Sequence, residues 1–178
     1  MLIEIIYFLL PGALANMMPV FVKKKMEYLN YPLDFGLKFG DKRLLGENKT
    51  FRGLFAAIIG SIFLVYVQSI FYDFQFFRNI SFINYFTTNF LVLGFLIGFG
   101  VMFGDALGSF FKRRVGYAPG KSFFLIDQIN GIIGMGFFVF PFYLKSFKIF
   151  LYCVLLWTLG HLILKFFGYL LKIDNKAF

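Results

Sequence analysis

The chain has 178 residues, of which 60% are hydrophobic and 15% are charged, and its mean hydropathy is +0.77. Ordinary soluble domains carry about 25% charged residues, so this composition excludes a soluble globular protein and indicates a polytopic membrane protein. The net charge of +9 does not indicate a nucleic-acid partner. The basic residues lie in short segments between apolar runs, where they encode orientation in a membrane.

Five apolar stretches have the length needed to cross a bilayer, which is about 20 residues. The predicted transmembrane helices cover Met1–Val22, Leu54–Tyr72, Asn89–Phe111, Leu125–Leu144 and Ile149–Leu171. The predicted fold is therefore an all-α integral membrane protein in which residues 1–178 form a single transmembrane domain.

The first apolar stretch has a second interpretation, a cleaved signal peptide, because Ala13-Leu14-Ala15 resembles a cleavage site. However, the residues before it lack Lys and Arg and include Glu4, and Lys23-Lys24-Lys25 follows it. Both features favour a retained helix whose carboxyl end faces the cytoplasm.

The distribution of basic residues predicts the orientation. The connection 23–53 holds eight Lys and Arg residues, the connection 112–124 holds four, and the tail after 171 holds two. These segments share one side of a five-helix topology, and the opposite side holds only Arg78, Lys145 and Lys148. By the positive-inside rule the N-terminus lies outside and the C-terminus in the cytoplasm, so that two cytoplasmic loops form the site.

The third predicted helix carries glycines at intervals of four residues: Gly94 and Gly98, and Gly100, Gly104 and Gly108. This small-xxx-small spacing lets helices approach closely. It predicts a packing role for all five glycines. It also predicts that the neighbouring Asp105 faces other helices and not lipid.

A carboxylate within a membrane helix costs about 2.5–3.5 kcal/mol, so Asp105 marks a candidate functional site. Ser109, Lys112 and Arg113 share its helix face by steps of three and four residues. The alternative for Asp105 is an internal Asp–Arg pair that orders the helix bundle.

Asp127 and Asn130 share a face near the start of the fourth predicted helix. Together with Asp105 they offer two carboxylates and an amide from adjacent helices, a set that suits Mg²⁺ held jointly with substrate phosphates. The alternative for Asp127 is a helix N-terminal acid stabilised by the helix dipole.

The first long connection ends with basic side chains that can bind phosphate. Lys49 supplies a mobile point charge and Arg52 a planar fork, and Thr50 lies between them. A positive-inside flank without a ligand is the alternative, and it is the preferred interpretation for the lysines at 23–25. Asn16, inside the first predicted helix, needs polar partners and would line a cavity.

The last predicted helix carries His161 and Lys165 four residues apart. A lone histidine in such a position is more often an interior residue than a metal ligand. Lys165 is expected to extend toward the cytoplasmic boundary of the membrane.

These motifs together resemble the CDP-archaeol synthase family, which is related to the CDP-diacylglycerol synthases. In the amino-terminal half the resemblance rests on Asn16, Pro19, Pro32-Leu33-Asp34-Phe35-Gly36, Asp41-Lys42-Arg43, Gly46 and Lys49-Thr50-Phe51-Arg52-Gly53. In the second cytoplasmic segment it rests on Gly104-Asp105, Ser109-Phe110, Lys112-Arg113-Arg114, Gly116, Gly120 and Asp127-Gln128.

The resemblance implies a cytidylyltransferase of the cell membrane with its site on the cytoplasmic face. CTP and 2,3-bis-O-geranylgeranyl-sn-glycerol 1-phosphate would give CDP-archaeol and pyrophosphate, with Mg²⁺ as cofactor. The expected catalytic residues are Asp105, Asp127, Lys112 and Arg113, and the expected metal ligands are Asp105, Asp127 and Asn130. The expected substrate-binding residues are Asn16, Lys49, Thr50, Arg52, Ser109, Arg114, Lys121 and Gln128.

Two positions depart from the family pattern. Asn130 stands where the family usually has a second aspartate, which leaves open whether one or two metal ions bind. Lys165 stands in place of the usual asparagine of the last helix. Two other functions stay open: a CDP-diacylglycerol synthase acting on acyl phosphatidate, and a small transporter or scaffold, against which the absence of an inverted sequence repeat argues.

Overall fold

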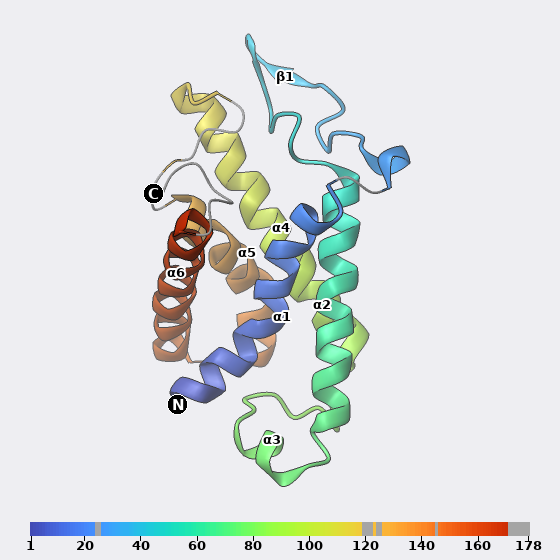
Figure 1. The fold of residues 1–178 in the computed structure, drawn as a ribbon, viewed down its shortest axis with the longest axis vertical. Coiled ribbons are helices and arrows are strands. Elements are labelled where there is room, and N and C mark those ends of the chain that lie inside the picture. Colours follow the sequence, from blue (N-terminus) through green and yellow to red (C-terminus); the bar gives the residue numbers. More distant parts are fainter. Residues whose placement is uncertain (24–25, 119–122, 124–125, 145, 171–178) are drawn as a thin grey trace.

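The computed structural model describes residues 1–23, 26–118, 123, 126–144 and 146–170, without the side chains at 164, 165 and 167–170. Its elements in chain order are α1 (Leu2–Phe21), η1 (Glu27–Leu29), β1 (Lys38–Phe39), β2 (Lys42–Arg43), α2 (Phe51–Phe71), α3 (Gln75–Asn79), α4 (Phe90–Val115), α5 (Ile126–Tyr143) and α6 (Phe147–Leu170) (Figure 1). Apart from the β1–β2 hairpin, these elements are helices, so the predicted helical fold is confirmed.

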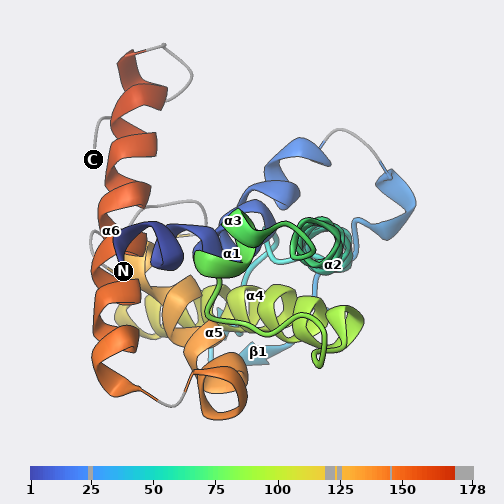
Figure 2. The ribbon, with the colours of Figure 1, turned by 90° about the horizontal axis from the view of Figure 1, so that it is seen from below.

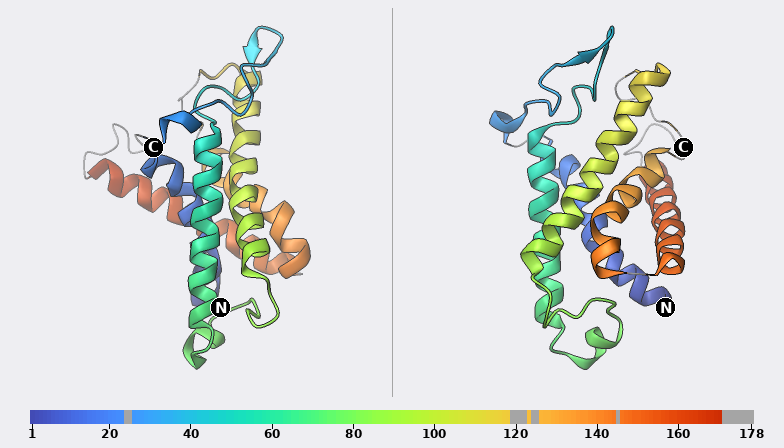
Figure 3. Two further views of the ribbon diagram at one scale, coloured as in Figure 1. Left: turned by 90° about the vertical axis from the view of Figure 1, so that its right-hand side faces the viewer. Right: turned by 180° about the vertical axis from the view of Figure 1, so that it is seen from behind.

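Among the described residues, α1, α2 and α4 are long and apolar enough to span a membrane. In α6 the described apolar segment is Phe147–Ile163, and α5 has 18 residues. Viewed along the long axis of the molecule, α2 is seen end-on while α6 extends across the view (Figure 2). The left-hand view of Figure 3 likewise shows α6 steeply inclined to α2. The chain is a membrane protein, and its five-span topology stays a prediction.

Helix α4 lies at the centre of the bundle, packed against α1, α2 and α5. Its glycines make the close approaches possible. A Cβ atom at Gly94 would lie 2.5 Å from the Cα atom of Ile62 in α2. A Cβ atom at Gly104 would lie 2.8 Å from the carbonyl carbon of Asn130 in α5. The packing role predicted from the glycine spacing is therefore confirmed.

Two of the predicted helix boundaries were wrong. Helix α2 begins at Phe51 and not at Leu54, because Thr50 caps its N-terminus by accepting a hydrogen bond from the Gly53 N–H at 3.3 Å. Helix α4 continues four residues beyond Phe111, to Val115. The next residue, Gly116, has a φ of +94° and ends the helix in the left-handed conformation.

The two ends of the bundle differ in composition. The first connection with its β1–β2 hairpin and the carboxyl end of α4 lie at one end, and the connection that contains α3 lies at the other (Figure 1). In the hairpin Lys38 pairs with Arg43 and Phe39 with Lys42. Neither the hairpin nor α3 was expected from the sequence.

Candidate active site

Two lysine–aspartate pairs lie at the hairpin end of the bundle. The Lys49 ammonium pairs with the Asp105 carboxylate and joins the first connection to α4. The Lys112 ammonium lies 2.7 Å from Oδ1 of Asp127 and joins α4 to α5. All four side chains are partly buried, so the charges are arranged in pairs that solvent can still reach.

Asn130 contacts Asp105 from the helix that also carries Asp127. Its Nδ2 donates to Oδ1 of Asp105 at 3.3 Å, and Asp127 lies three residues earlier on the same helix. The close contact between α4 and α5 makes this possible, since a Cβ atom at Gly108 would lie 2.7 Å from the Asn130 Nδ2. Asp105, Asp127, Asn130, Lys49 and Lys112 are called the two-aspartate cluster below.

Asp127 also organises the start of its own helix. Its Oδ2 accepts a hydrogen bond from the Phe123 N–H at 2.9 Å, and its own N–H donates to the Phe123 carbonyl at 3.1 Å. A helix N-terminus favours a negative charge. The two interpretations weighed for Asp127 are therefore compatible, because one carboxylate oxygen holds the helix start and the other faces Lys112.

The two-aspartate cluster fits a divalent cation of the hard type. Mg²⁺ prefers oxygen ligands, is usually held by one or two carboxylates, and takes its other ligands from water and substrate phosphates. Within the part of the chain that the structure describes, no group of three or more His, Cys, Asp or Glu side chains forms. Two carboxylates and one amide are the donor types that such a cation would take from the protein, and water and substrate phosphates would have to supply its other ligands.

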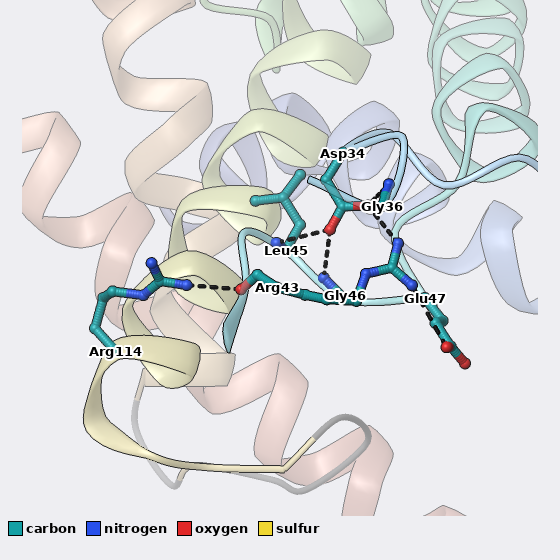
Figure 4. A network of polar contacts seen from close by, with 7 residues as sticks. All are labelled: Asp34, Gly36, Arg43, Leu45, Gly46, Glu47 and Arg114. Carbon is teal, nitrogen blue, oxygen red and sulfur yellow. Dashed lines mark hydrogen bonds and ion pairs between the residues drawn. The ribbon is translucent and has the colours of Figure 1, made fainter. Parts of the chain in front are cut away.

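Three arginines are close in sequence to the two lysines of the cluster, and they differ in their contacts. Arg52 is buried in the first turn of α2. Arg113 is buried, and its Nη1 donates to the Tyr117 carbonyl just beyond the end of α4. Arg114 donates from Nη2 to the Arg43 carbonyl at 2.6 Å, which ties α4 to the hairpin (Figure 4). The guanidinium groups of Arg113 and Arg114 therefore bind backbone carbonyls in this structure.

The remaining expected site residues occupy varied positions. Ser109 and Gln128 are buried, and neither amide atom of Gln128 has a hydrogen-bond partner among the described residues. Thr50 serves as the N-cap of α2. Lys121 and the side chain of Lys165 lie outside the described residues.

Asn16 lines an apolar cavity of about 380 Å³ between α1 and α6. His161 lines the same cavity from α6, and apolar side chains of both helices form nearly all of the remaining wall. The expectation that Asn16 borders a cavity is confirmed, and the surroundings suit a hydrocarbon chain better than a phosphate.

One buried carboxylate received no role from the sequence. Asp34 is 4% exposed, and its side chain accepts four hydrogen bonds within the first connection. Burial by itself raises the pKa of Asp34, but the hydrogen bonds from the Arg43 guanidinium and from the backbone N–H groups of Gly46, Leu45 and Gly36 together hold its pKa well below the usual range.

A local sequence signal for Asp34 exists. An aspartate followed two residues later by glycine is typical of a turn in which the carboxylate binds the backbone two residues on. The structure shows this arrangement, with the Gly36 N–H 3.1 Å from Oδ1 of Asp34 and a φ of +81° at Gly36. The partners at 43, 45 and 46 are not part of that signal.

The helical membrane fold, with charged side chains paired at one end of the bundle, is shared with a known intramembrane enzyme. A solved structure described as "Structural insight into an intramembrane enzyme for archaeal membrane lipids biosynthesis" is similar at a TM-score of 0.71 and 25% identity, covering 89% of this chain and 90% of that one.

Sequence comparisons specify the family. The family model CarS-like, CDP-archaeol synthase, matches residues 1–178. The CDP-archaeol synthase of Archaeoglobus fulgidus is 36% identical over 72% of this chain and 69% of its own length. Those of Methanococcus maripaludis strain C7 (34%; 80% and 78%) and Sulfolobus acidocaldarius (30%; 98% and 96%) are also similar. The chain therefore belongs to the CDP-archaeol synthase family.

Proposed function

We propose that the protein transfers CMP from CTP to an isoprenoid ether lipid phosphate, 2,3-bis-O-geranylgeranylglycerol 1-phosphate, and releases pyrophosphate. An oxygen of the lipid phosphate attacks the α-phosphorus of CTP. The bond from that phosphorus to the oxygen bridging to the β-phosphate breaks, and its electrons leave with pyrophosphate. The observation that carries this proposal is the two-aspartate cluster, in which carboxylates on two packed helices are each paired with a lysine and Asn130 joins one helix to the other.

The reaction needs no general base, since a phosphate monoester is mostly ionised near neutrality, with a second pKa of about 6. The main barrier is repulsion between two phosphate anions. Asp105, Asp127 and Asn130 would hold Mg²⁺, which when bound neutralises phosphate charge. In this structure Lys49 forms an ion pair with Asp105 and Lys112 with Asp127. Each lysine would contact phosphate when its aspartate binds the metal ion instead.

The other basic and polar groups of the two cytoplasmic segments would assist. Arg52 lies in the first turn of α2 and Arg113 in the last turn of α4. A guanidinium fork can bind phosphate in two contacts. The buried amide of Gln128 and the hydroxyl of Ser109 would supply polar contacts to the nucleotide. Thr50, Arg114 and Lys121 complete the proposed set, with Thr50 and Arg114 acting through the backbone that they hold.

The lipid chains would lie against the apolar cavity between α1 and α6. Its wall is almost entirely hydrocarbon, with Asn16 and His161 as its polar members. Because the chemistry ends at the phosphate, an acyl phosphatidate would be accepted by the same charged site. Turnover of ether-linked and acyl-linked phosphates by the purified protein decides between them, and faster turnover of the acyl-linked phosphate would favour the CDP-diacylglycerol synthase alternative.

We also propose five membrane spans in the cell membrane, with the N-terminus outside and the two-aspartate cluster at the cytoplasmic face. The support is that the hairpin and the carboxyl end of α4, both rich in Lys and Arg, lie at one end of the bundle (Figure 1). A reporter that is active only in the cytoplasm, fused after Phe178, should be active. An inactive fusion that is inserted normally would contradict the orientation.

The activity itself is tested with purified protein, CTP, Mg²⁺ and the isoprenoid glycerol phosphate, by the release of pyrophosphate. Asp105→Asn and Asp127→Asn should each reduce turnover at least about 100-fold, because each removes one metal-binding charge. Thermal melting in the same detergent shows whether each variant is folded. Near-wild-type turnover in both variants would contradict the proposed metal site.

A further inference from the structure

The first connection contains a buried carboxylate that touches none of the proposed reacting groups. We propose that Asp34 is a positioning residue, which holds Lys49 in place for nucleotidyl transfer through the folded backbone between α1 and α2. This inference rests on the proposed function of the two-aspartate cluster and deepens it, because it assigns a role to a residue outside that cluster.

Both oxygens of Asp34 are used within the connection. Oδ1 accepts hydrogen bonds from the Gly36 N–H at 3.1 Å and from Nη2 of Arg43 at 2.5 Å. Oδ2 accepts from the N–H groups of Leu45 and Gly46 at 3.1 and 3.0 Å (Figure 4). One side chain thus fastens the segment before the hairpin to the segment after it.

These two segments hold the backbone of Lys49 from both sides. The N–H of Leu33, the residue before Asp34, donates to the Lys49 carbonyl at 2.7 Å. The Lys49 N–H donates to the carbonyl of Gly46, whose own N–H is bound by Asp34, at 3.3 Å. Pro32 forms a bridge with Thr50, the next residue. Two short hydrogen-bonded paths therefore run from Asp34 to Lys49.

The far side of the connection is attached to α4, which carries Asp105 and Lys112. The Arg114 guanidinium donates to the Arg43 carbonyl at 2.6 Å and lies 5.2 Å from the ring centre of Phe39 and 4.8 Å from that of Phe110. Arg43 is in turn bound by Asp34. The carboxylate thus sits between the point where the hairpin docks on α4 and the lysine that reaches Asp105.

The matched test is Asp34→Asn, which has the same shape but no charge, and which places an NH₂ donor against other donors. A misplacement of about 1 Å at a catalytic group costs about 100-fold in rate, so kcat/KM for CTP should fall by about 100-fold. In a Lys49→Ala background the same change should cost less than about threefold, because residues that act through one group are not additive.

Glu47→Gln is the control. Glu47 is exposed, lies in the same connection, and contacts the same Arg43 at 3.4 Å, so this change removes one negative charge without touching the path to Lys49. Its kcat/KM should stay at the wild-type value. If Asp34→Asn does not fold, Arg43→Ala replaces it in the same double-mutant cycle with Lys49→Ala, because it removes one of the four hydrogen bonds to Asp34. Arg43→Lys should restore most of the activity.

The outcomes separate the two proposals. Additive losses for Asp34→Asn and Lys49→Ala, or an Asp34→Asn protein with a lower melting temperature but unchanged kcat/KM, would overturn the positioning role and leave the proposed function intact. A folded wild-type protein that releases no pyrophosphate would overturn the proposed function itself.

Discussion

The two ends of this bundle are held together by different interactions. At the end that contains α3, Tyr72 packs edge-on against Tyr85 and Phe86, with ring centres 5.4 and 5.0 Å apart, and Arg78 lies over the Phe86 ring. At the hairpin end, lysines and aspartates from three segments form ion pairs. Aromatic packing offers no charged group to a phosphate, whereas an ion pair can be exchanged for a cation and phosphates. The comparison supports the proposal that the reaction takes place at the hairpin end.

The largest expected effect comes from the helix contact that supports the charged end. Gly104→Ala places a Cβ atom against the Asn130 backbone, so α5 must move and carry Asn130 away from Asp105. Overpacking of this kind costs about 1–3 kcal/mol, and pyrophosphate release should be almost abolished. Thermal melting and turnover are the measurements. Phe111→Leu, on the exposed face of the same helix, should leave both near wild type, and equal effects of the two changes would contradict this account.

A smaller effect is expected from removing Lys49, which would compete with a metal ion for Asp105. In Lys49→Ala the Asp105 carboxylate loses its ammonium partner, so Mn²⁺ should bind more tightly without nucleotide while turnover falls. A partly exposed ion pair contributes about 1 kcal/mol or less, so the gain in affinity should be up to about fivefold. Electron paramagnetic resonance of free Mn²⁺ measures it. Lys38→Ala, an exposed lysine of β1, should change neither, and weaker Mn²⁺ binding in Lys49→Ala would contradict the competition.

The smallest effect on activity is expected at the opposite end. Tyr85→Phe removes the hydroxyl that donates to Oε1 of Gln68 at 2.8 Å, a buried hydrogen bond whose loss costs about 1 kcal/mol. The melting temperature should fall by a few degrees and kcat/KM should not change. A loss of activity at an unchanged melting temperature would show that the α3 end takes part in the chemistry and would break the comparison.

The helices and their packing faces could be predicted because they depend on local periodicity. The spacing of Gly94 and Gly104 identified faces that do contact α2 and α5. The sequence also predicted that Asp105 and Asn130 contribute to one site, and a hydrogen bond between them joins α4 to α5. The hairpin was missed because two-residue strands carry almost no alternation pattern, and the contacts of Arg114 with the Arg43 carbonyl join distant segments of the chain.

By itself the sequence determined a helical membrane protein and the glycine faces of α4, because hydropathy and helical spacing act over a few residues. It also named the residues of the proposed phosphate and metal site. Only the tertiary structure decided which charges meet. Lys49 and Asp105 are 56 residues apart in sequence, and their pairing depends on how the connection folds around Asp34 and docks on α4. Long-range pairs of this kind follow from the packing of whole segments, which no local pattern encodes.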